Sequence, residues 1–319
     1  MNIFSTNAAG LKNKLQSLKN ELKSLNAAIF TIQESHFSKK GLLKVDDYEI
    51  FEAIRSKKHG GSVIGVHKAL DPVLISEYSE DFELVVVEIA IADKEIRIMS
   101  GYGPQENLSE AERMPFFVAL EAEIARAEIA GKSIYIEMDA NSKLGEEFVS
   151  EDPHPQTPNG KILSGILSRH GLIVCNSLDD KCKGTITRKR ITKDHTEESV
   201  IDFVIISDDL EKDLIAMEVD EDREHVLKRV TKTKKGTVIK ESDHNVLISK
   251  FNLKWRRQMK ERIKLYNLKN KDAQKIFKEL TTGNNFLSSV FDSSGDLDSL
   301  TNKFLKRLNG VICKSFKKI

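Results

Sequence analysis

The sequence predicts an α/β layered domain over residues 1–253, followed by a basic and mostly helical tail or linker over residues 254–319. Short apolar runs of strand length alternate with three longer helical stretches, which is the pattern of an α/β fold rather than of an all-β fold. The charge changes near residue 253. Residues 251–319 hold 16 Lys and Arg against 6 Asp and Glu, whereas residues 1–250 hold 34 basic and 43 acidic residues.

Three stretches have the pattern of helices. Leucines recur between residues 11 and 25 at steps of four, three, four and three, which makes one apolar face of an amphipathic helix. Residues 109–130 are rich in Ala, Glu and Arg and precede Gly131, a plausible helix stop. Residues 158–171 form a second amphipathic pattern.

Between these helices lie apolar runs of strand length. Their alternation and their flanking turn residues are typical of buried strands. The expected strands are residues 28–33, 60–67, 84–91, 94–103, 133–138, 172–177 and 199–207, and the stretch after Asn245 that ends near residue 253.

The composition excludes several classes of protein. No apolar run reaches the about 18 residues that a membrane span needs, so we expect no membrane partner. The first residues lack the layout of a secretion signal. Cys175, Cys182 and Cys313 have no paired spacing, which argues against a disulfide partner and a zinc knuckle and favours a reducing, intracellular compartment.

Polar residues gather at the ends of the predicted strands. Asp139 and Asn141, which follow residues 133–138, would alone be typical of a turn. The other strand ends carry polar residues too, and ligand or catalytic groups of α/β sheets collect at such ends. The residues concerned are Asn7, Glu34, Tyr102, Asp139, Asn141, Asp243 and His244.

This set of carboxylates, amides, a tyrosine and a histidine matches the needs of phosphodiester hydrolysis. That reaction uses a divalent cation on the phosphate, a base for the attacking water and donors for the developing charge. Oxygen ligands without a Cys/His cluster favour Mg²⁺, with Mn²⁺ as a substitute, over Zn²⁺.

Asp202 is the carboxylate that is hardest to explain as an ordinary exposed side chain. It lies inside the apolar run 199–207, where a buried carboxylate needs a partner, and His244 can supply one. Five further histidines belong to no motif, and we expect ordinary surface or core positions for them. They are His36, His59, His154, His170 and His195.

Taken in chain order, these motifs resemble those of the endonuclease/exonuclease/phosphatase superfamily. The matching stretches are Asn7 after the first strand, Q-E-S with Glu34, G-Y-G-P with Tyr102, D-A-N with Asp139 and Asn141, V-I-D-F-V with Asp202 and S-D-H with Asp243 and His244. The resemblance covers residues 1 to about 253. It implies a four-layered α/β sandwich of two packed, mostly antiparallel sheets, with the site where their strand ends meet.

The resemblance also implies a role for each residue. Glu34 would hold the metal, with Asn7 beside it and Asp243 completing the shell through water. Asp139 would align or deprotonate the attacking water, and Asn141 and Tyr102 would contact the phosphate. His244 would contact the scissile phosphate and be oriented by Asp202. One departure is that most members have Gly-Asp-Phe-Asn where this chain has Met138-Asp139-Ala140-Asn141.

Two further stretches favour nucleic acid as the substrate. Residues 184–199 carry a basic tip, and in the endonucleases of non-LTR retrotransposons the corresponding segment is a hairpin that probes DNA. Basic side chains there would meet phosphates. The basic tail resembles the stretch that follows those endonucleases. The candidate DNA-binding residues of the tip are Arg188, Lys189, Arg190 and Lys193.

The sequence therefore predicts a Mg²⁺-dependent endonuclease that nicks double-stranded DNA, similar to the nicking module of a non-LTR retrotransposon, with access to the nucleus. Three alternatives stay open at this stage. They are an apurinic-site (AP) endonuclease of DNA repair, a lipid or inositol phosphodiesterase of the same superfamily, and a silent binding module that keeps the fold.

Overall fold

The structure of the protein is a computed structural model. It describes the backbone of residues 1–54, 60–149, 152, 154–192, 195–233 and 236–255, and the side chains of these residues except 232–236. The chain divides into two units, residues 1–257 and 258–319. The predicted tail 254–319 therefore lies outside the described residues, apart from Lys254 and Trp255. No helix of the described part is long and apolar enough to cross a membrane.

Two sheets form the body of the first unit. The strands of the first sheet are β10 (Cys182–Lys183), β14 (Leu214–Val219), β17 (Leu247–Phe251), β1 (Asn2–Asn7), β2 (Ala27–Gln33), β4 (Ser62–His67) and β3 (Tyr48–Ala53), in this spatial order. Those of the second are β5 (Val73–Tyr78), β6 (Glu83–Ile91), β7 (Lys94–Tyr102), β8 (Ser133–Asp139), β13 (Asp202–Ile206) and β9 (Ile173–Val174). Most neighbours are antiparallel, and the parallel pairs among the described strands are β1 with β2, β7 with β8 and β10 with β14.

The predicted helices are present at the expected places. They are α1 (Leu15–Ser24), α2 (Glu110–Ile129) and α3 (Pro158–Arg169), joined by the short α4 (Asp208–Glu211) and the 3₁₀ turns η1 (Lys68–Leu70) and η2 (Cys175–Ser177). A reciprocal capping box of Ser109 and Glu112 starts α2. The Thr157 hydroxyl caps α3, and Pro158 takes the first helical position, where its missing N–H costs nothing.

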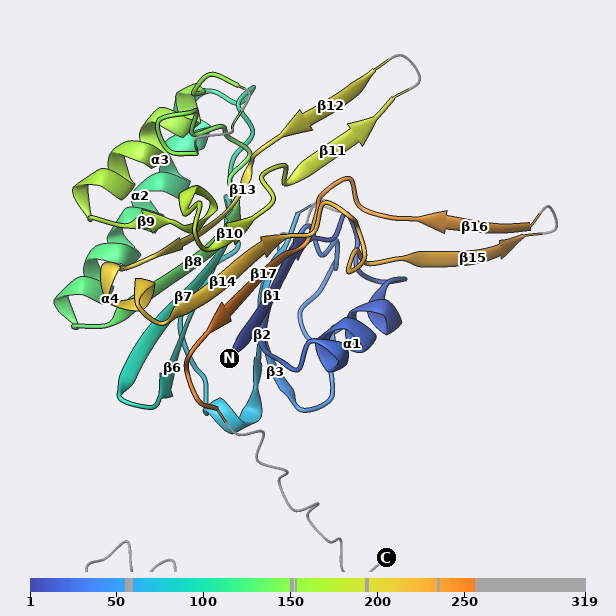
Figure 1. The fold of residues 1–319 in the computed structure, drawn as a ribbon, viewed down its shortest axis with the longest axis horizontal. Helices are drawn as coiled ribbons and strands as arrows, with labels where there is room; N and C mark the ends of the chain where they lie inside the picture. The colour runs from blue at the N-terminus through green and yellow to red at the C-terminus, as the bar shows by residue number, and fades with distance from the viewer. Residues whose placement is uncertain (55–59, 150–151, 153, 193–194, 234–235, 256–319) are drawn as a thin grey trace, which may run out of the picture. The chain divides into compact units, whose positions relative to one another are not determined.

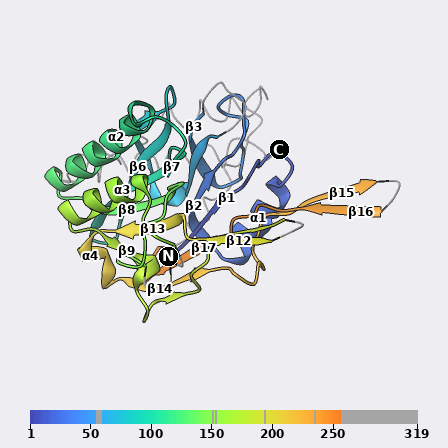
Figure 2. The ribbon, with the colours of Figure 1, turned by 90° about the horizontal axis from the view of Figure 1, so that it is seen from above.

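Three apolar clusters separate four layers (Figures 1 and 2). The first fills the space between the two sheets and includes Ile29 and Ile98. The second joins the six-stranded sheet to α2 and α3 through Phe116 and Leu163. The third joins the seven-stranded sheet to α1, whose buried side chains include Leu18. The predicted four-layered sandwich of two mostly antiparallel sheets is confirmed.

One predicted strand is shorter than its apolar run. Residues 172–177 form only β9 and then turn into η2. The reason is Asn176, whose side chain takes over the pairing with β13: its Nδ2 donates to the Asp202 carbonyl at 3.2 Å and its Oδ1 accepts from the Val204 amide at 3.1 Å. A side chain that binds backbone groups in this way competes with a strand ladder.

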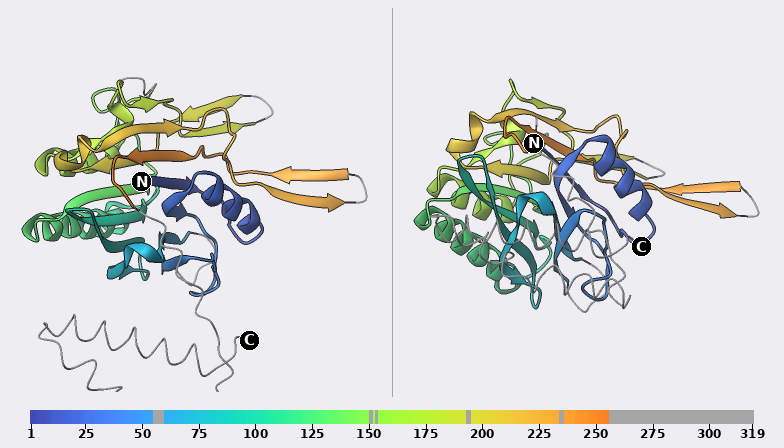
Figure 3. Two further views of the ribbon diagram at one scale, coloured as in Figure 1. Left: turned by 60° about the horizontal axis from the view of Figure 1, so that its bottom comes forward. Right: turned by 90° about the horizontal axis from the view of Figure 1, so that it is seen from below.

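Two hairpins project from one end of the sheets (Figure 3). The first is β11 (Arg188–Ile191) with β12 (Thr196–Ser199), and the second is β15 (Arg229–Thr233) with β16 (Gly236–Lys240). Each strand of a hairpin pairs along its length with the other. The sequence predicts the first hairpin through its resemblance but not the second.

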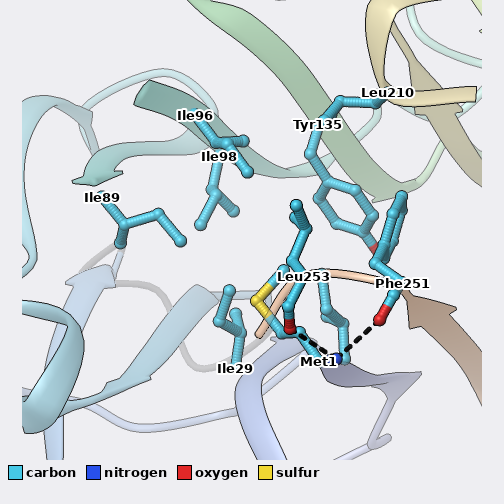
Figure 4. A pocket seen from close by; sticks show the side chains of 10 residues that line it. Met1, Ile29, Ile89, Ile96, Ile98, Tyr135, Leu210, Phe251 and Leu253 are labelled. Atoms are coloured by element: carbon cyan, nitrogen blue, oxygen red, sulfur yellow. Dashed lines mark hydrogen bonds between the residues drawn. The ribbon is translucent and has the colours of Figure 1, made fainter. Parts of the chain in front are cut away.

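At the opposite end lies an apolar cavity between the sheets (Figure 4). Ile29, Ile89, Ile96 and Tyr135 are among its lining residues. Met1 also lines it, and the ammonium group of Met1 donates to the carbonyls of Phe251 and Leu253. Its volume of about 10 Å³ is no more than one water molecule needs. None of the predicted site residues lines this cavity.

Candidate active site

Strand register brings the predicted residues to one end of the two sheets. In the six-stranded sheet, Asp139 lies opposite Tyr102 on one side and opposite Asp202 on the other. In the seven-stranded sheet, the parallel strands β1 and β2 pair Asn7 with Gln33, so Glu34, the next residue, comes within hydrogen-bond distance of Asn7. Because the sheets pack face to face, these five side chains meet at a shared edge.

Asp139 occupies the centre of the site. Its Oδ2 accepts a hydrogen bond from Asn7 Nδ2 at 2.8 Å, and its Oδ1 accepts one from the Asn141 amide at 2.9 Å. Asn141 has a φ of 46°, a left-handed conformation that asparagine tolerates better than most residues, and its Nδ2 donates to the Gly103 carbonyl at 2.9 Å. The D-A-N stretch therefore does form a turn, and this turn holds the Asp139 carboxylate in place.

Glu34 accepts hydrogen bonds from three side chains. Asn7 Nδ2 lies 3.1 Å and the Tyr102 hydroxyl 2.8 Å from Oε1, and His36 Nε2 lies 3.1 Å from Oε2. Burial opposes ionisation, but the hydrogen bonds from His36, Tyr102 and Asn7 outweigh it and lower the pKa of Glu34 to about 2. Burial, with Glu34 and Asp139 nearby, raises the pKa of Tyr102, which stays a neutral donor.

His244 and Asp202 form a buried pair. His244 Nδ1 lies 2.9 Å from Asp202 Oδ2, and the two residues are 5% and 2% exposed. Thr187 positions the acid, because its Oγ1 accepts a hydrogen bond from the Asp202 amide at 3.1 Å. With Nδ1 bound to the carboxylate, Nε2 is left to point at the site, 3.9 Å from Asp139 Oδ2.

The surroundings raise the pKa of both His244 and Asp139, which favours the charged form of the histidine but the neutral form of the carboxyl group. Burial would lower the pKa of His244, but Asp202 outweighs it and raises that pKa to about 9, so the imidazole is charged at neutral pH. Burial and then Asp202 raise the pKa of Asp139 to about 7, with His244 opposing the rise. A carboxylate with such a pKa can exchange a proton near neutral pH.

Asp243 lies beside the histidine but is engaged elsewhere. Its Oδ1 is 4.0 Å from His244 Nε2, while its Oδ2 accepts a hydrogen bond from Arg188 Nε at 2.9 Å and lies 2.9 Å from an Nη of the same guanidinium. Of the three predicted metal ligands, the structure therefore brings Glu34 and Asn7 together and places Asp243 on the histidine side, in an ion pair with the first residue of β11.

The residues present fit a hard divalent cation near Glu34. This carboxylate is ionised and partly exposed, and carboxylate oxygens are among the ligands that Mg²⁺ and Mn²⁺ prefer. Asn7 faces the two carboxylates with Nδ2, while its Oδ1 accepts from the Ala9 amide at 2.9 Å. The ligand atoms of Asp139, Asp202 and His244 also lie within 4.8 Å of one another. We favour Glu34, because the other group is buried and Asp202 already occupies Nδ1 of His244.

Three of the four predicted DNA-binding residues lie on the first hairpin. Lys189 and Arg190 are exposed on β11, and Lys189 Nζ is 2.6 Å from Glu198 of β12. Arg188 starts the strand and is bound to Asp243, as described. Lys193 lies outside the described residues.

Two residues of the site were missed by sequence reasoning. We expected an ordinary position for His36, yet it binds Glu34; a left-handed φ at both residues, 49° and 55°, turns the two side chains toward each other. The spacing in Q-E-S-H is the signal that could have found it. Thr187 has no such signal, because its partner Asp202 is fifteen residues away and the contact depends on the start of the first hairpin.

The two residues that depart from the family pattern are core residues. Met138 and Ala140 are fully buried in the cluster between the six-stranded sheet and its helices. The carbonyl of Ala140 lies so close to Gly103 that a side chain at the glycine would overlap it. The changed packing therefore lies behind Asp139 and Asn141, whose side chains keep their contacts.

A cavity of about 400 Å³ adjoins the exposed side of Glu34. Tyr102, Phe82 and Glu83 line it together with the segment from Gly103 to Gln105. A ligand that reached Glu34 and Tyr102 would therefore have open space beside it.

Comparison with solved structures finds the same fold in several proteins that act on nucleic acids. The endonuclease domain of TRAS1, a telomere-specific non-LTR retrotransposon, is 20% identical with a TM-score of 0.55, over 80% of this chain and 99% of that domain. An AP endonuclease from Archaeoglobus fulgidus is 15% identical with a TM-score of 0.57, over 79% of this chain and 99% of its own.

A third structure with this fold contains nucleic acid. It is the 3′ phosphatase NExo from Neisseria bound to a product DNA hairpin, 16% identical with a TM-score of 0.58, over 80% of this chain and 100% of its own. No protein-family model matches the sequence, and no curated protein matches it. Identities of 15–20% show a shared fold, so what the chain does must be argued from its site.

Proposed function

We propose that this chain, which has the endonuclease/exonuclease/phosphatase fold, is a Mg²⁺-dependent endonuclease that nicks double-stranded DNA, similar to the nicking module of a non-LTR retrotransposon. The observation that carries the proposal is the position of Asp139. It lies between the Glu34–Asn7 network and the charged His244–Asp202 pair, so an acid–base group, a candidate metal ligand and a phosphate donor face one point.

The side chains supply most of what the hydrolysis needs. Glu34, with Asn7 beside it, would hold the magnesium ion, which when bound polarises the phosphate and neutralises its charge. Asp139 accepts a proton from the water whose oxygen bonds to phosphorus. The bond from phosphorus to the 3′ oxygen breaks, the leaving oxygen takes up a proton from solvent, and the products are a 3′-hydroxyl and a 5′-phosphate. His244 Nε2 donates to a non-bridging oxygen and stabilises the charge that develops there.

Two features favour DNA as the substrate. The first hairpin leaves the sheets directly beside His244, since Arg188 and His244 form an isolated bridge, and it presents Lys189 and Arg190 to solvent. Basic residues at such a position meet backbone phosphates. The structurally similar TRAS1 domain is an endonuclease, and NExo was seen with DNA. A lipid or inositol phosphate would have no use for a projecting arm. We further propose an intracellular location with access to nuclear DNA.

The test is nicking of supercoiled plasmid by the full chain. We expect relaxed circles with Mg²⁺, fewer or equal with Mn²⁺, and none with EDTA. His244→Ala and Asp139→Ala should remove nicking while circular dichroism and the denaturation midpoint show a folded protein. Wild-type rates in both variants would refute the site. Release of phosphate from an inositol lipid without nicking would refute the substrate.

A second substrate separates the two DNA activities. An AP endonuclease needs a pocket for an extruded abasic sugar. Equal cleavage of plain and abasic duplexes is expected for a nicking module. Cleavage confined to abasic duplexes would replace our proposal by repair.

A further inference from the structure

Packing of the domain core does not explain why the β15–β16 hairpin is present. Its strands pair with each other and with no other described strand. A two-stranded ribbon buries no core and is marginal by itself. Val230 and Ile239, which lie opposite each other, are 61% and 57% exposed. Folding gives no reason to keep such a ribbon, so its side chains are free to serve a contact.

The charge of this hairpin identifies the kind of contact. Residues 228–240 include six Lys and Arg and no acidic residue. Arg229 and Lys240 are direct cross-strand partners, and both are exposed. Like charges in that arrangement destabilise a hairpin. A polyanion between or along the strands would remove the repulsion and release counterions.

The base of the hairpin is fastened to the active site. Three residues separate Lys240 from His244, and Arg223 holds this segment: its guanidinium donates to the Ser242 carbonyl and, at 2.9 Å, to Asn245 Oδ1. Where the chain enters the hairpin, Asp220 accepts from the His225 amide at 2.7 Å. Anchored on both sides, the ribbon has a fixed root beside the catalytic histidine.

The two hairpins leave the molecule at the same end. The first starts at Arg188, which bridges His244, and the second ends just before it, and Figures 1 and 3 show both projecting from that end. Each strand of the second hairpin has five residues, or about 16 Å at ~3.3 Å per residue. At ~3.4 Å per nucleotide this equals the length of about five base pairs.

We propose that the β15–β16 hairpin is a second DNA-binding arm, which contacts backbone phosphates of the duplex a few base pairs from the scissile bond. The proposal rests on the proposed function, since it adds a surface to the same site. Arg229 and Lys240 are its phosphate-contacting residues among those whose side chains are described. The arm is blind to sequence, because backbone phosphates carry no base information.

The experiment measures binding of the full chain to a 30-base-pair duplex in EDTA, by fluorescence anisotropy from 50 to 200 mM salt. The double variant Arg229→Gln/Lys240→Gln should bind more weakly at 50 mM. Two lost phosphate contacts lower the slope of log affinity against log salt by about 1.8, so the advantage of the wild type should shrink about twelvefold over this range.

Two matched variants make the result specific. Arg229→Lys/Lys240→Arg keeps both charges and should keep the wild-type slope. Lys212→Gln/Lys250→Gln removes two exposed charges at the far end of the sheets, where Lys250 lies opposite Asn2, and should change binding little. Equal losses in the far-end variant, or loss in the charge-conserving one, would overturn the arm.

The outcome also separates the arm from the proposed function. If the wild type nicks plasmid and binds the duplex, and Arg229→Gln/Lys240→Gln matches it in Kd and slope, only the arm is wrong. If the wild type neither nicks nor binds DNA, the endonuclease proposal fails with it. A partner protein on the exposed Val230 and Ile239 would give the first of these results.

Discussion

Asp202→Asn tests the coupling of the buried pair to catalysis. The substitution keeps the shape of the side chain and its backbone contacts but removes the charge that faces His244 Nδ1 at 2.9 Å. In the wild type this carboxylate, with smaller contributions from Asp139 and Asp243, raises the pKa of His244 from 6.5 to about 9 against the effect of burial. A rise of that size corresponds to about 3 kcal/mol in favour of the imidazolium.

Without the Asp202 carboxylate, burial still lowers the pKa of His244 and only the smaller effects of Asp139 and Asp243 raise it, so we expect that pKa to fall back toward its ordinary value of 6.5. At pH 7.5 about one molecule in ten would then carry the charge, which slows nicking about tenfold. Loss of the orienting hydrogen bond adds a factor of 10 to 100, as for other residues that orient a functional histidine. We therefore expect nicking to slow by about 10² to 10³ at pH 7.5.

Two measurements check this reasoning. Single-turnover nicking with saturating Mg²⁺ gives the rate from pH 6 to 9, and NMR of the histidine ring gives the pKa of His244 in the metal-free protein. Toward pH 6 the wild type should lose rate as Asp139, with a pKa of about 7, takes up a proton. The variant should lose less, because its His244 gains charge over the same range. Asp209→Asn, in α4 just beyond the far end of β13, controls for general effects of losing an aspartate. Wild-type nicking at pH 7.5 with an unchanged His244 titration would refute the argument.

Three further changes test other parts of the molecule. Burial raises the pKa of Glu137 from 4.5 to about 8, so between these pH values the folded protein keeps a proton that the unfolded chain loses. The free energy of unfolding therefore falls as the pH rises through this range, by up to about 1.4 kcal/mol per pH unit. Glu137→Gln should remove this part of the slope in urea denaturation at pH 5, 7 and 8; parallel curves for both proteins would contradict it. Arg188→Gln should lower kcat about tenfold, because it releases Asp243 beside the histidine. Arg190→Gln on the exposed strand should instead raise KM three- to tenfold and leave kcat unchanged. If Arg188→Gln also raised KM and left kcat unchanged, Arg188 would act only through DNA contacts. Ala140→Phe, which restores the residue common in the superfamily, should destabilise the protein by about 1–3 kcal/mol through overpacking of a fully buried position, and an unchanged denaturation midpoint would show that a cavity is available.

The sequence was sufficient for the body of the fold and for the strand ends. Period-two apolar runs predict buried strands, and the polar residue that ends such a run must lie at a sheet edge, which is where Tyr102, Asp139 and Asn7 are found. The β15–β16 hairpin could not be found in this way. Both of its faces are open to solvent, so its strands have no apolar periodicity, and Val230 and Ile239 are exposed.

Contacts between distant segments were beyond sequence reasoning for a different reason. The ion pair of Arg188 with Asp243 depends on how β11 meets the start of β17, and neither residue carries a local sign of it. Sequence reasoning therefore assigned Arg188 to DNA and Asp243 to metal. The structure joins the two, and that contact decides how freely Asp243 can turn toward the site.

The same backbone supports the His244–Asp202 pair and the first hairpin. The Thr187 hydroxyl accepts a hydrogen bond from the Asp202 amide at 3.1 Å, and the Thr187 carbonyl accepts one from the Asn245 amide at 2.6 Å. The next residue, Arg188, starts β11 and forms a bridge with His244. A shift of the hairpin root therefore moves the supports of both members of the pair. Because a few tenths of an ångström in such supports change the orientation of a donor, the hairpin and the His244–Asp202 pair cannot vary independently.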